Sequence, residues 1–263
     1  MSAPAPVEVH RDGAIVRIVL ADPARANALS PAMVAALGDL FARDWRAEGV
    51  RALLLAGAGR HFSAGADLAH LASLQEATPE ANRRDSEALR ALFESLLRQE
   101  VLTVALVHGA CVAGGCGLAT ACDFVVAAEG ATFQYTEVRI GFVPALVATF
   151  LPLRVRGSDL RELLLHPRPL AAPEALAIGL VNRVVPAAEL ASAGLALADE
   201  ILAAASSEAI ARTKRLLLDL AGQPLATRLD LATAANAEAR ATADCRRGIA
   251  TFLADKRTPD WRR

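Results

Sequence analysis

The sequence has almost no excess of charge of either sign. It contains 28 lysine and arginine residues against 29 aspartate and glutamate residues, which gives a formal net charge of −1. Proteins that bind nucleic acid or anionic membranes usually present a basic surface, and this balance provides none. The basic pairs at 83–84 and 246–247 are isolated and are typical of solvated helix faces. We therefore expect no nucleic acid and no membrane as a partner.

We also expect no secretory signal peptide and no cysteine motif. Residues 1–6 lack the charged and apolar regions of a secretory signal peptide. No apolar run approaches the roughly 18 residues needed to cross a bilayer. The cysteines Cys111, Cys116, Cys122 and Cys245 lack the spacing of zinc or redox motifs, so we expect no metal, reduced thiols and a cytoplasmic location. Cys116 is expected to fill space rather than act as a nucleophile, because no histidine lies near it in the sequence.

Hydrophobic residues make up 54% of the 263 residues, enough for a large buried core. Apolar runs of strand length alternate with helical segments, which is typical of an α/β fold with mainly parallel strands. Strands are predicted at 14–20, 50–56, 102–107, 123–128, 132–135 and 181–185. Helices are predicted at 30–46, 79–99, 114–122, 173–178, 187–205, 207–220, 225–240 and 244–255, with an irregular lid segment at 68–78. We divide the chain into a core, residues 1–195, and a C-terminal helical region, residues 196–263.

Two loops of small residues each follow an apolar run. They are FSAGADL at 62–68 and VAGGCGL at 112–118. Residues with so little bulk let a ligand approach the backbone, so that amide N–H groups can point at it. Two such donors that converge on one oxygen form an oxyanion hole, which stabilises an enolate or a tetrahedral oxyanion by about 3–4 kcal/mol per donor. The pair of loops therefore indicates carbonyl chemistry.

Glu137 is the candidate acid–base residue. It follows an extended segment and lies among apolar neighbours. Apolar surroundings raise the pKa of a carboxyl group, which allows it to exchange protons near neutral pH. Local sequence alone favours the alternative, a solvent-facing Glu137 paired with Arg139.

A set of short motifs, taken in order, resembles the crotonase superfamily of enoyl-CoA hydratases and isomerases. Each motif is weak alone, but their order and spacing together are specific, and they extend from about Val9 to the C-terminus. The matching segments are RANAL at 25–29, FSAGAD at 62–67, HG at 108–109 with GGCG at 114–117, ACD at 121–123, 133–141, GLVN at 179–182 and 252–257.

The resemblance implies a spiral of ββα units followed by C-terminal helices that build a homo-trimer, two of which commonly stack into a homo-hexamer. It also implies an acyl-CoA thioester as substrate, with no separate cofactor because coenzyme A is part of that substrate. The family's oxyanion donors match the backbone N–H groups of Ala66 and Gly114, and its acid–base glutamate matches Glu137.

The same resemblance implies a substrate-binding set. Arg25 matches a position near the CoA phosphates, where a guanidinium contact is chemically reasonable, although an unpartnered surface arginine is an equal alternative. Phe252 and Lys256 match tail residues that reach the CoA of a neighbouring subunit; an ordinary solvated helix end is the alternative for Lys256. Asp67 is expected to fix its loop by accepting backbone hydrogen bonds. The full set is Arg25, Ala26, Ala64, Gly65, Ala66, Asp67, Leu68, Gly114, Phe252 and Lys256.

The second glutamate of the two-carboxylate hydratases is replaced here by Gly117. One carboxylate suffices for a 1,3-proton shift, as in a Δ3,Δ2-enoyl-CoA isomerase, and could also add water to a 2-enoyl-CoA. The segment after Glu137 resembles a hydratase branch that includes methylglutaconyl-CoA hydratase-like proteins, so we expect a hydratase of fatty-acid or branched-chain acyl-CoA metabolism. A catalytically silent acyl-CoA-binding protein is the non-enzymatic alternative. Acyl chain length is left open, with Leu146, Val147 and Phe150 as candidate pocket walls.

Overall fold

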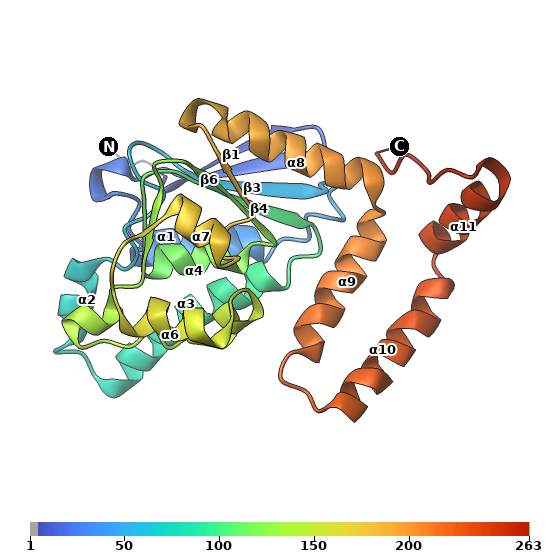
Figure 1. Ribbon diagram of the computed structural model, residues 1–263. Coiled ribbons are helices and arrows are strands. Elements are labelled where there is room, and N and C mark those ends of the chain that lie inside the picture. Colours follow the sequence, from blue (N-terminus) through green and yellow to red (C-terminus); the bar gives the residue numbers. More distant parts are fainter. Residues whose placement is uncertain (1–4, 263) are drawn as a thin grey trace.

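The computed structural model describes residues 5–262 and contains two β-sheets flanked by helices (Figure 1). The larger sheet has six strands in the order β1-β2-β3-β4-β6-β9. β1 is antiparallel to β2, and every other neighbouring pair is parallel. The predicted α/β core is therefore confirmed. The strands are β1 (Val7–Asp12), β2 (Ile15–Leu20), β3 (Ala52–Gly57), β4 (Leu102–Val107), β6 (Phe124–Ala128) and β9 (Arg183–Val185).

The central strands are recognisable in the sequence because helices cover both faces of the sheet. All of β4 and the first four residues of β3 are buried. Alternate residues of β3 point to opposite faces: Leu53 and Leu55 enter one apolar core, and Leu54 enters the other. β1 was not predicted, because its charged sequence VEVHRD forms an exposed edge strand without an apolar run.

The smaller sheet has three short strands in the order β5-β7-β8. β5 (Ala110–Val112) is parallel to β7 (Thr132–Gln134), and β8 (Leu170–Ala171) is antiparallel to β7. Only β7 was predicted, because strands of two or three residues are too short to show a periodic pattern. This sheet carries the second small-residue loop at the end of β5.

Helices pack on both faces of the larger sheet. α1 (Pro31–Phe41), α3 (Pro79–Leu97) and α4 (Gly114–Ala121) lie on one face, and α8 (Leu190–Ala204) lies on the other. The start of α1 is as predicted: the Ser30 hydroxyl accepts a hydrogen bond from the third helical N–H, and proline is the first helical residue.

The segment after the first small-residue loop is helical rather than irregular. α2 (Leu68–Leu74) begins where the Asp67 carboxylate accepts hydrogen bonds from the N–H groups of Ala69 and His70. The expectation of an irregular segment at 68–78 was wrong for residues 68–74, because α2 buries none of its residues and therefore shows no apolar stripe. Residues 75–78 are irregular as expected. The expected role of Asp67 in fixing its loop is confirmed.

Short helices connect the smaller sheet to β9. They contribute buried residues to the larger apolar core. They are 3₁₀ turns at Glu137–Ile140 and Leu151–Leu153 and helices α5 (Val147–Phe150), α6 (Gly157–Leu165) and α7 (Ala172–Ala177). Two further 3₁₀ turns lie elsewhere, at Pro23–Arg25 after β2 and at Ala187–Glu189 after β9.

The last three helices extend away from the sheets as an arm (Figure 1). They are α9 (Ser207–Leu220), α10 (Leu225–Arg240) and α11 (Ala243–Asp255), close to the predicted ranges. α10 and α11 bury none of their described residues within the chain. The division expected after residue 195 falls inside α8, whose Leu197 and Leu202 pack against the sheet, and the first helix to leave the sheet is α9.

No single helix within residues 5–262 has both the length and the apolar composition to cross a membrane. The pair Ala187–Ala204 and Ser207–Leu220, bent by 102°, meets that test together on length and composition only.

Candidate active site

The two small-residue loops are joined into one backbone unit. The Val112 N–H donates to the Ser63 carbonyl at 2.9 Å, and Ser63 also forms a β-bridge with Cys111. A Cβ on Gly65 would lie 2.5 Å from the Val112 carbonyl oxygen, so glycine is required for this approach. Gly65 also has a φ of +81°, a region that glycine adopts without steric cost. The loops therefore hold a fixed position relative to each other.

Ala113 holds the second loop in a strained conformation. Its φ of +47° and ψ of −118° lie where residues with a Cβ are rarely found. Such conformations cost about 1–3 kcal/mol and concentrate at functional sites. The Ala113 N–H donates to the Gln134 carbonyl of β7 at 2.7 Å, which anchors the peptide that precedes Gly114.

Ala66 and Gly114 carry the predicted oxyanion donors. Within residues 5–262, neither N–H donates a hydrogen bond to another residue, and both residues are partly exposed. Leu29 contacts both: it forms a β-bridge with Ala66, and its Cδ1 would lie 2.9 Å from a Cβ on Gly114. Partly buried amides without partners favour an external acceptor such as a carbonyl oxygen.

Glu137 begins a 3₁₀ turn three residues after Gln134, the residue that anchors the second loop. Its Oε2 atom is buried and has no hydrogen-bond partner. Burial raises the pKa of the Glu137 carboxyl above its usual range, and hydrogen bonds from the backbone N–H groups of Glu137 and Thr136 oppose this in part. A carboxyl group in this state can accept and return a proton near neutral pH.

The alternative pairing of Glu137 with Arg139 does not occur. Among the described residues, no ion pair joins the two side chains, and the Arg139 backbone N–H donates to the Thr136 carbonyl. Arg139 therefore does not offset the rise that burial causes in the pKa of Glu137.

Gly117 faces an apolar wall rather than an open space. A Cβ at this position would lie 2.8 Å from Phe93 Cζ and 3.0 Å from Val147 Cγ2. Both side chains are buried, so a glutamate would not fit here without their displacement. The absence of a second carboxylate is thus built into the packing of α3 and α5 against α4.

Neighbouring acids have structural partners. The Asp123 carboxylate accepts hydrogen bonds from the Thr103 N–H and hydroxyl and lies 2.7 Å from Lys214 Nζ. Asp67 caps α2 and lies 3.4 Å from Arg25 Nη1. These contacts give Asp123 and Asp67 structural roles, whereas the buried Oε2 atom of Glu137 has no hydrogen-bond partner.

The predicted CoA-phosphate residue Arg25 is held beside the first loop. Its guanidinium lies 2.6 Å from Asp22 and 3.4 Å from Asp67, and its side chain is 56% exposed. The next residue in the motif, Ala26, has a φ of +49° and accepts a hydrogen bond from the Ala64 N–H at 2.8 Å. These contacts bring Arg25, Ala26 and Ala64 together near Ala66, as the predicted set requires.

Asn27 is the residue that sequence reasoning missed. Its buried amide donates to the carbonyls of Ala58, His61 and Phe62, and its Oδ1 accepts from the Asp22 N–H. An asparagine inside the RANAL motif was the available signal, but its partners are more than thirty residues away for all three carbonyls. Asn27 fixes the entry to the first loop.

Comparison with known proteins identifies the family. Residues 10–263 match the family described as Enoyl-CoA hydratase/isomerase. A protein of Thermus thermophilus named "Putative enoyl-CoA hydratase" is 45% identical over 257 residues, which cover 96% of this chain and 99% of the relative. This chain belongs to the enoyl-CoA hydratase/isomerase family.

Further relatives of this enoyl-CoA hydratase/isomerase family member agree over the full length. Cyclohexa-1,5-dienecarbonyl-CoA hydratase of Thauera aromatica is 30% identical and matches 99% of this chain and 97% of its own. The crystal structure of an enoyl-CoA hydratase of Mycobacterium smegmatis superposes with a TM-score of 0.90, at 29% identity, covering 98% of this chain and 99% of that one. The expected crotonase fold is confirmed.

The predicted tail residues lie away from the site of their own chain. Phe252 is 52% exposed near the end of α11, and Lys256 follows that helix with a φ of +55°. Figure 1 places α11 on the side of the molecule opposite α2, which follows the first loop. Their predicted contact with the CoA of a neighbouring subunit therefore remains a prediction about an assembly.

Cys116 has the space-filling role that was expected. It is fully buried, and its Sγ donates to the Cys111 carbonyl at 2.9 Å. Burial also raises the pKa of the Cys111 thiol well above its usual value and that of Cys122 to about 12. These thiols are therefore kept in the unreactive, protonated form.

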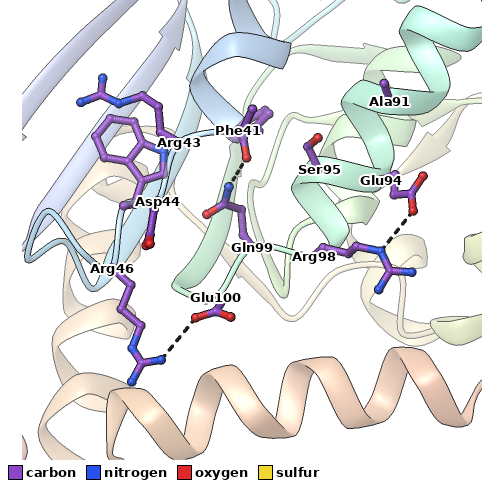
Figure 2. Close-up of a pocket in the computed structure, with 12 residues that line it drawn as sticks. Phe41, Arg43, Asp44, Arg46, Ala91, Glu94, Ser95, Arg98, Gln99 and Glu100 are labelled. Atoms are coloured by element: carbon purple, nitrogen blue, oxygen red, sulfur yellow. Dashed lines mark hydrogen bonds and ion pairs between the residues drawn. The ribbon is translucent and has the colours of Figure 1, made fainter.

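A cavity of about 520 Å³ lies between the C-terminal ends of α1 and α3 and contains none of the predicted site residues. Figure 2 shows two of its arginines in ion pairs, Arg98 with Glu94 and Arg46 with Glu100, which are 3.1 Å and 3.2 Å long. The third, Arg43, lies 2.6 Å from Glu48. Its arginines and acids are equal in number, so the cavity offers no net charge to a ligand. The predicted site residues of the two loops and Glu137 lie outside this cavity.

Proposed function

We propose that this family member adds water to a 2-enoyl-CoA thioester. The observation that carries the proposal is the combination of two unpartnered amides, on Ala66 and Gly114, with the buried carboxyl group of Glu137. Both relatives quoted above carry the word hydratase in their names, which supports a hydro-lyase.

The reaction needs one base and one oxyanion hole. The Glu137 carboxylate takes a proton from water while the hydroxyl oxygen bonds to C3 of the substrate. The electron pair of the C2=C3 double bond moves toward the thioester, and the resulting enolate oxygen accepts hydrogen bonds from the Ala66 and Gly114 N–H groups. Glu137 then returns the proton to C2, which gives the 3-hydroxyacyl-CoA and regenerates the carboxylate.

A Δ3,Δ2-enoyl-CoA isomerase is the second candidate. The specific observation in its favour is the apolar wall at Gly117, where a second carboxylate would not fit. Isomerisation requires Glu137 to remove a proton from C2 of a 3-enoyl-CoA and return it to C4, with the same enolate in the same oxyanion hole. The buried, unpartnered Oε2 atom of Glu137, together with the raised pKa of its carboxyl group, supports a working base over a silent acyl-CoA-binding protein.

We infer that the functional unit is a homo-trimer or homo-hexamer. The exposed apolar residues of the arm support this, because Leu225 is 63% exposed and Leu253 66% exposed in the single chain. Covering such residues with another copy removes apolar surface from water. The proposed acyl-CoA contacts of Phe252 and Lys256 would then belong to a neighbouring subunit's site.

A panel of 2-enoyl- and 3-enoyl-CoAs with product identification tests the proposal. A hydratase converts the 2-enoyl members to 3-hydroxyacyl-CoAs, with loss of the conjugated absorbance. Efficient conversion of the 3-enoyl members, with no turnover of any 2-enoyl-CoA, would replace the proposal with the isomerase. Incubation in heavy water separates both enzymes from a silent binder, because deuterium enters the acyl chain only where a base works.

A further inference from the structure

Phe93 lies in the direction in which a side chain on residue 117 would project. Gly117 follows Gly114 by three residues on α4, so the two share a helix face and lie ~4.5 Å apart along the axis. A Cβ on Gly117 would be 2.8 Å from Phe93 Cζ and 3.0 Å from its Cε1. The edge of the ring therefore stands about one helical turn beyond the Gly114 N–H.

The ring belongs to a closed apolar wall. The centroids of Phe93 and Phe150 are 5.5 Å apart, with the ring planes tilted by 57°. Phe93, Phe150 and Val147 are each between 3% and 5% exposed. Phe93 lies on α3 and Phe150 on α5. Either ring can therefore be replaced without moving the two loops that carry Ala66 and Gly114.

We propose that Phe93 determines which acyl groups the chain accepts, by closing the acyl pocket one helical turn beyond the Gly114 N–H. The inference rests on the proposed function in one respect, that a thioester oxygen binds at that amide. Acyl carbons that run along α4 from this oxygen meet the ring edge after a few bonds. The pocket accordingly takes short, uncharged acyl groups, since a charged end would lose its hydration against an apolar wall.

Saturated acyl-CoAs test this inference without any reaction. Butyryl-, hexanoyl-, octanoyl- and decanoyl-CoA are titrated calorimetrically into the wild-type protein and the Phe93→Ala variant. The wild type is expected to bind butyryl-CoA more tightly than decanoyl-CoA. Phe93→Ala is expected to shift the ratio of the two dissociation constants toward decanoyl-CoA by at least tenfold, because one methylene in an apolar pocket changes selectivity by roughly 10–200-fold.

Phe41→Ala is the matched control. Phe41 ends α1, is 3% exposed as Phe93 is, and loses the same side-chain volume when truncated. It is expected to lower the unfolding temperature but leave the ratio of dissociation constants unchanged. An equal shift in the two variants would trace the effect to general loosening of the core and would overturn the inference.

Gly117→Ala gives an independent test that does not open a cavity. Its methyl group would lie 2.8 Å from Phe93 Cζ and 3.0 Å from Val147 Cγ2, so the Phe93 ring has to shift to admit it. The expected result is a chain-length profile altered from that of the wild type while butyryl-CoA still binds. The inference fails if neither variant changes the profile, or if no acyl-CoA of any length binds.

The outcome is separable from that of the proposed function. Binding of saturated acyl-CoAs does not depend on a working base, whereas hydration and isomerisation do. A changed profile in Phe93→Ala, together with no turnover of any enoyl-CoA, would keep the role of Phe93 and reject the hydratase.

Discussion

The oxyanion loops and the C-terminal arm differ in how much of their structure the chain itself enforces. The loops are held by backbone hydrogen bonds from three directions, through Ser63, Leu29 and Gln134. The arm buries no residue of α10 or α11 and exposes its large apolar side chains. The contacts that fix the loops all lie within one chain, whereas the arm has an apolar surface that a single chain leaves exposed.

This difference suggests separate roles for the two regions, catalysis for the loops and assembly for the arm. Atoms that must stabilise a developing charge have to be in place before the substrate arrives, because preorganisation is the source of their effect. A surface for assembly needs only shape and apolar area, which can wait for a partner. Substitutions in the loops should therefore act on chemistry and folding, and those in the arm on assembly.

The largest expected effect is the loss of turnover in Glu137→Gln. The amide keeps the shape of the side chain but accepts no proton, so kcat should fall by about 10²–10⁴-fold. Asp230→Asn, an exposed carboxylate of α10, is the matched change in the arm and should leave kcat unaltered. Binding of butyryl-CoA should persist in both variants. Near-normal turnover in Glu137→Gln would remove this residue from the mechanism.

Gly65→Ala is expected to have the next largest effect, on folding. The added Cβ meets the Val112 carbonyl at 2.5 Å, and the φ of +81° adds strain. Gly222→Ala in the turn between α9 and α10 is the control: its φ is +70°, but no atom lies within 4 Å of the new Cβ. Gly222→Ala should cost only the strain, about 1–3 kcal/mol, and Gly65→Ala clearly more. Denaturant unfolding measures both, and equal costs would contradict the close contact of the loops.

Substitutions in the arm should change the mass of the particle in solution more than the stability of the single chain. Phe252→Ser combined with Leu253→Ser removes apolar surface that is more than half exposed, so the stability of one chain should change by roughly 0.5 kcal/mol or less. If other copies cover these residues, the double variant has a lower mass in light scattering after gel filtration. Leu165→Ser, on a residue 70% exposed on α6, is the control. An unchanged mass in the double variant would disprove the assembly role of this end of α11.

The smallest expected effect is a pH-dependent gain in the stability of the Glu137→Gln variant over the wild type. Because burial raises the pKa of Glu137, the folded state holds its proton more tightly than the unfolded state. Between the unfolded and folded pKa values the free energy of unfolding therefore falls as pH rises. Glu137→Gln removes this loss, so the variant should exceed the wild type in stability at pH 7.5, and this advantage should shrink toward pH 4. A constant difference at all pH values would contradict the raised pKa.

Much of the fold could be predicted because its signals are local. Buried parallel strands appear as continuous apolar runs. The hydroxyl of Ser30 and the proline at position 31 directly mark the N-terminus of α1. The elements that were missed lack such signals: β8 has only two residues, and α2 has no buried face. Their formation depends on partners distant in the sequence, which no local pattern reports.

For the candidate site, the sequence allowed prediction of the residue types and of the positions that match the family motifs. The small residues of both loops and the position of Glu137 could be read from the sequence. The three-carbonyl contact of Asn27 and the wall of Phe93 against Gly117 could not, because they join segments 24 or more residues apart. Contacts of this kind follow from how helices and loops pack, and they decide what the family's common chemistry can act on.

Ala113 has a consequence for how this protein could be improved or degraded by mutation. A glycine at this position would relieve the backbone and make the folded state more stable. It would also allow the peptide plane between residues 113 and 114 to rotate, so the amide hydrogen of Gly114 would no longer have a single direction. Stability of the folded state therefore favours glycine at position 113, whereas a fixed direction of the Gly114 N–H favours alanine.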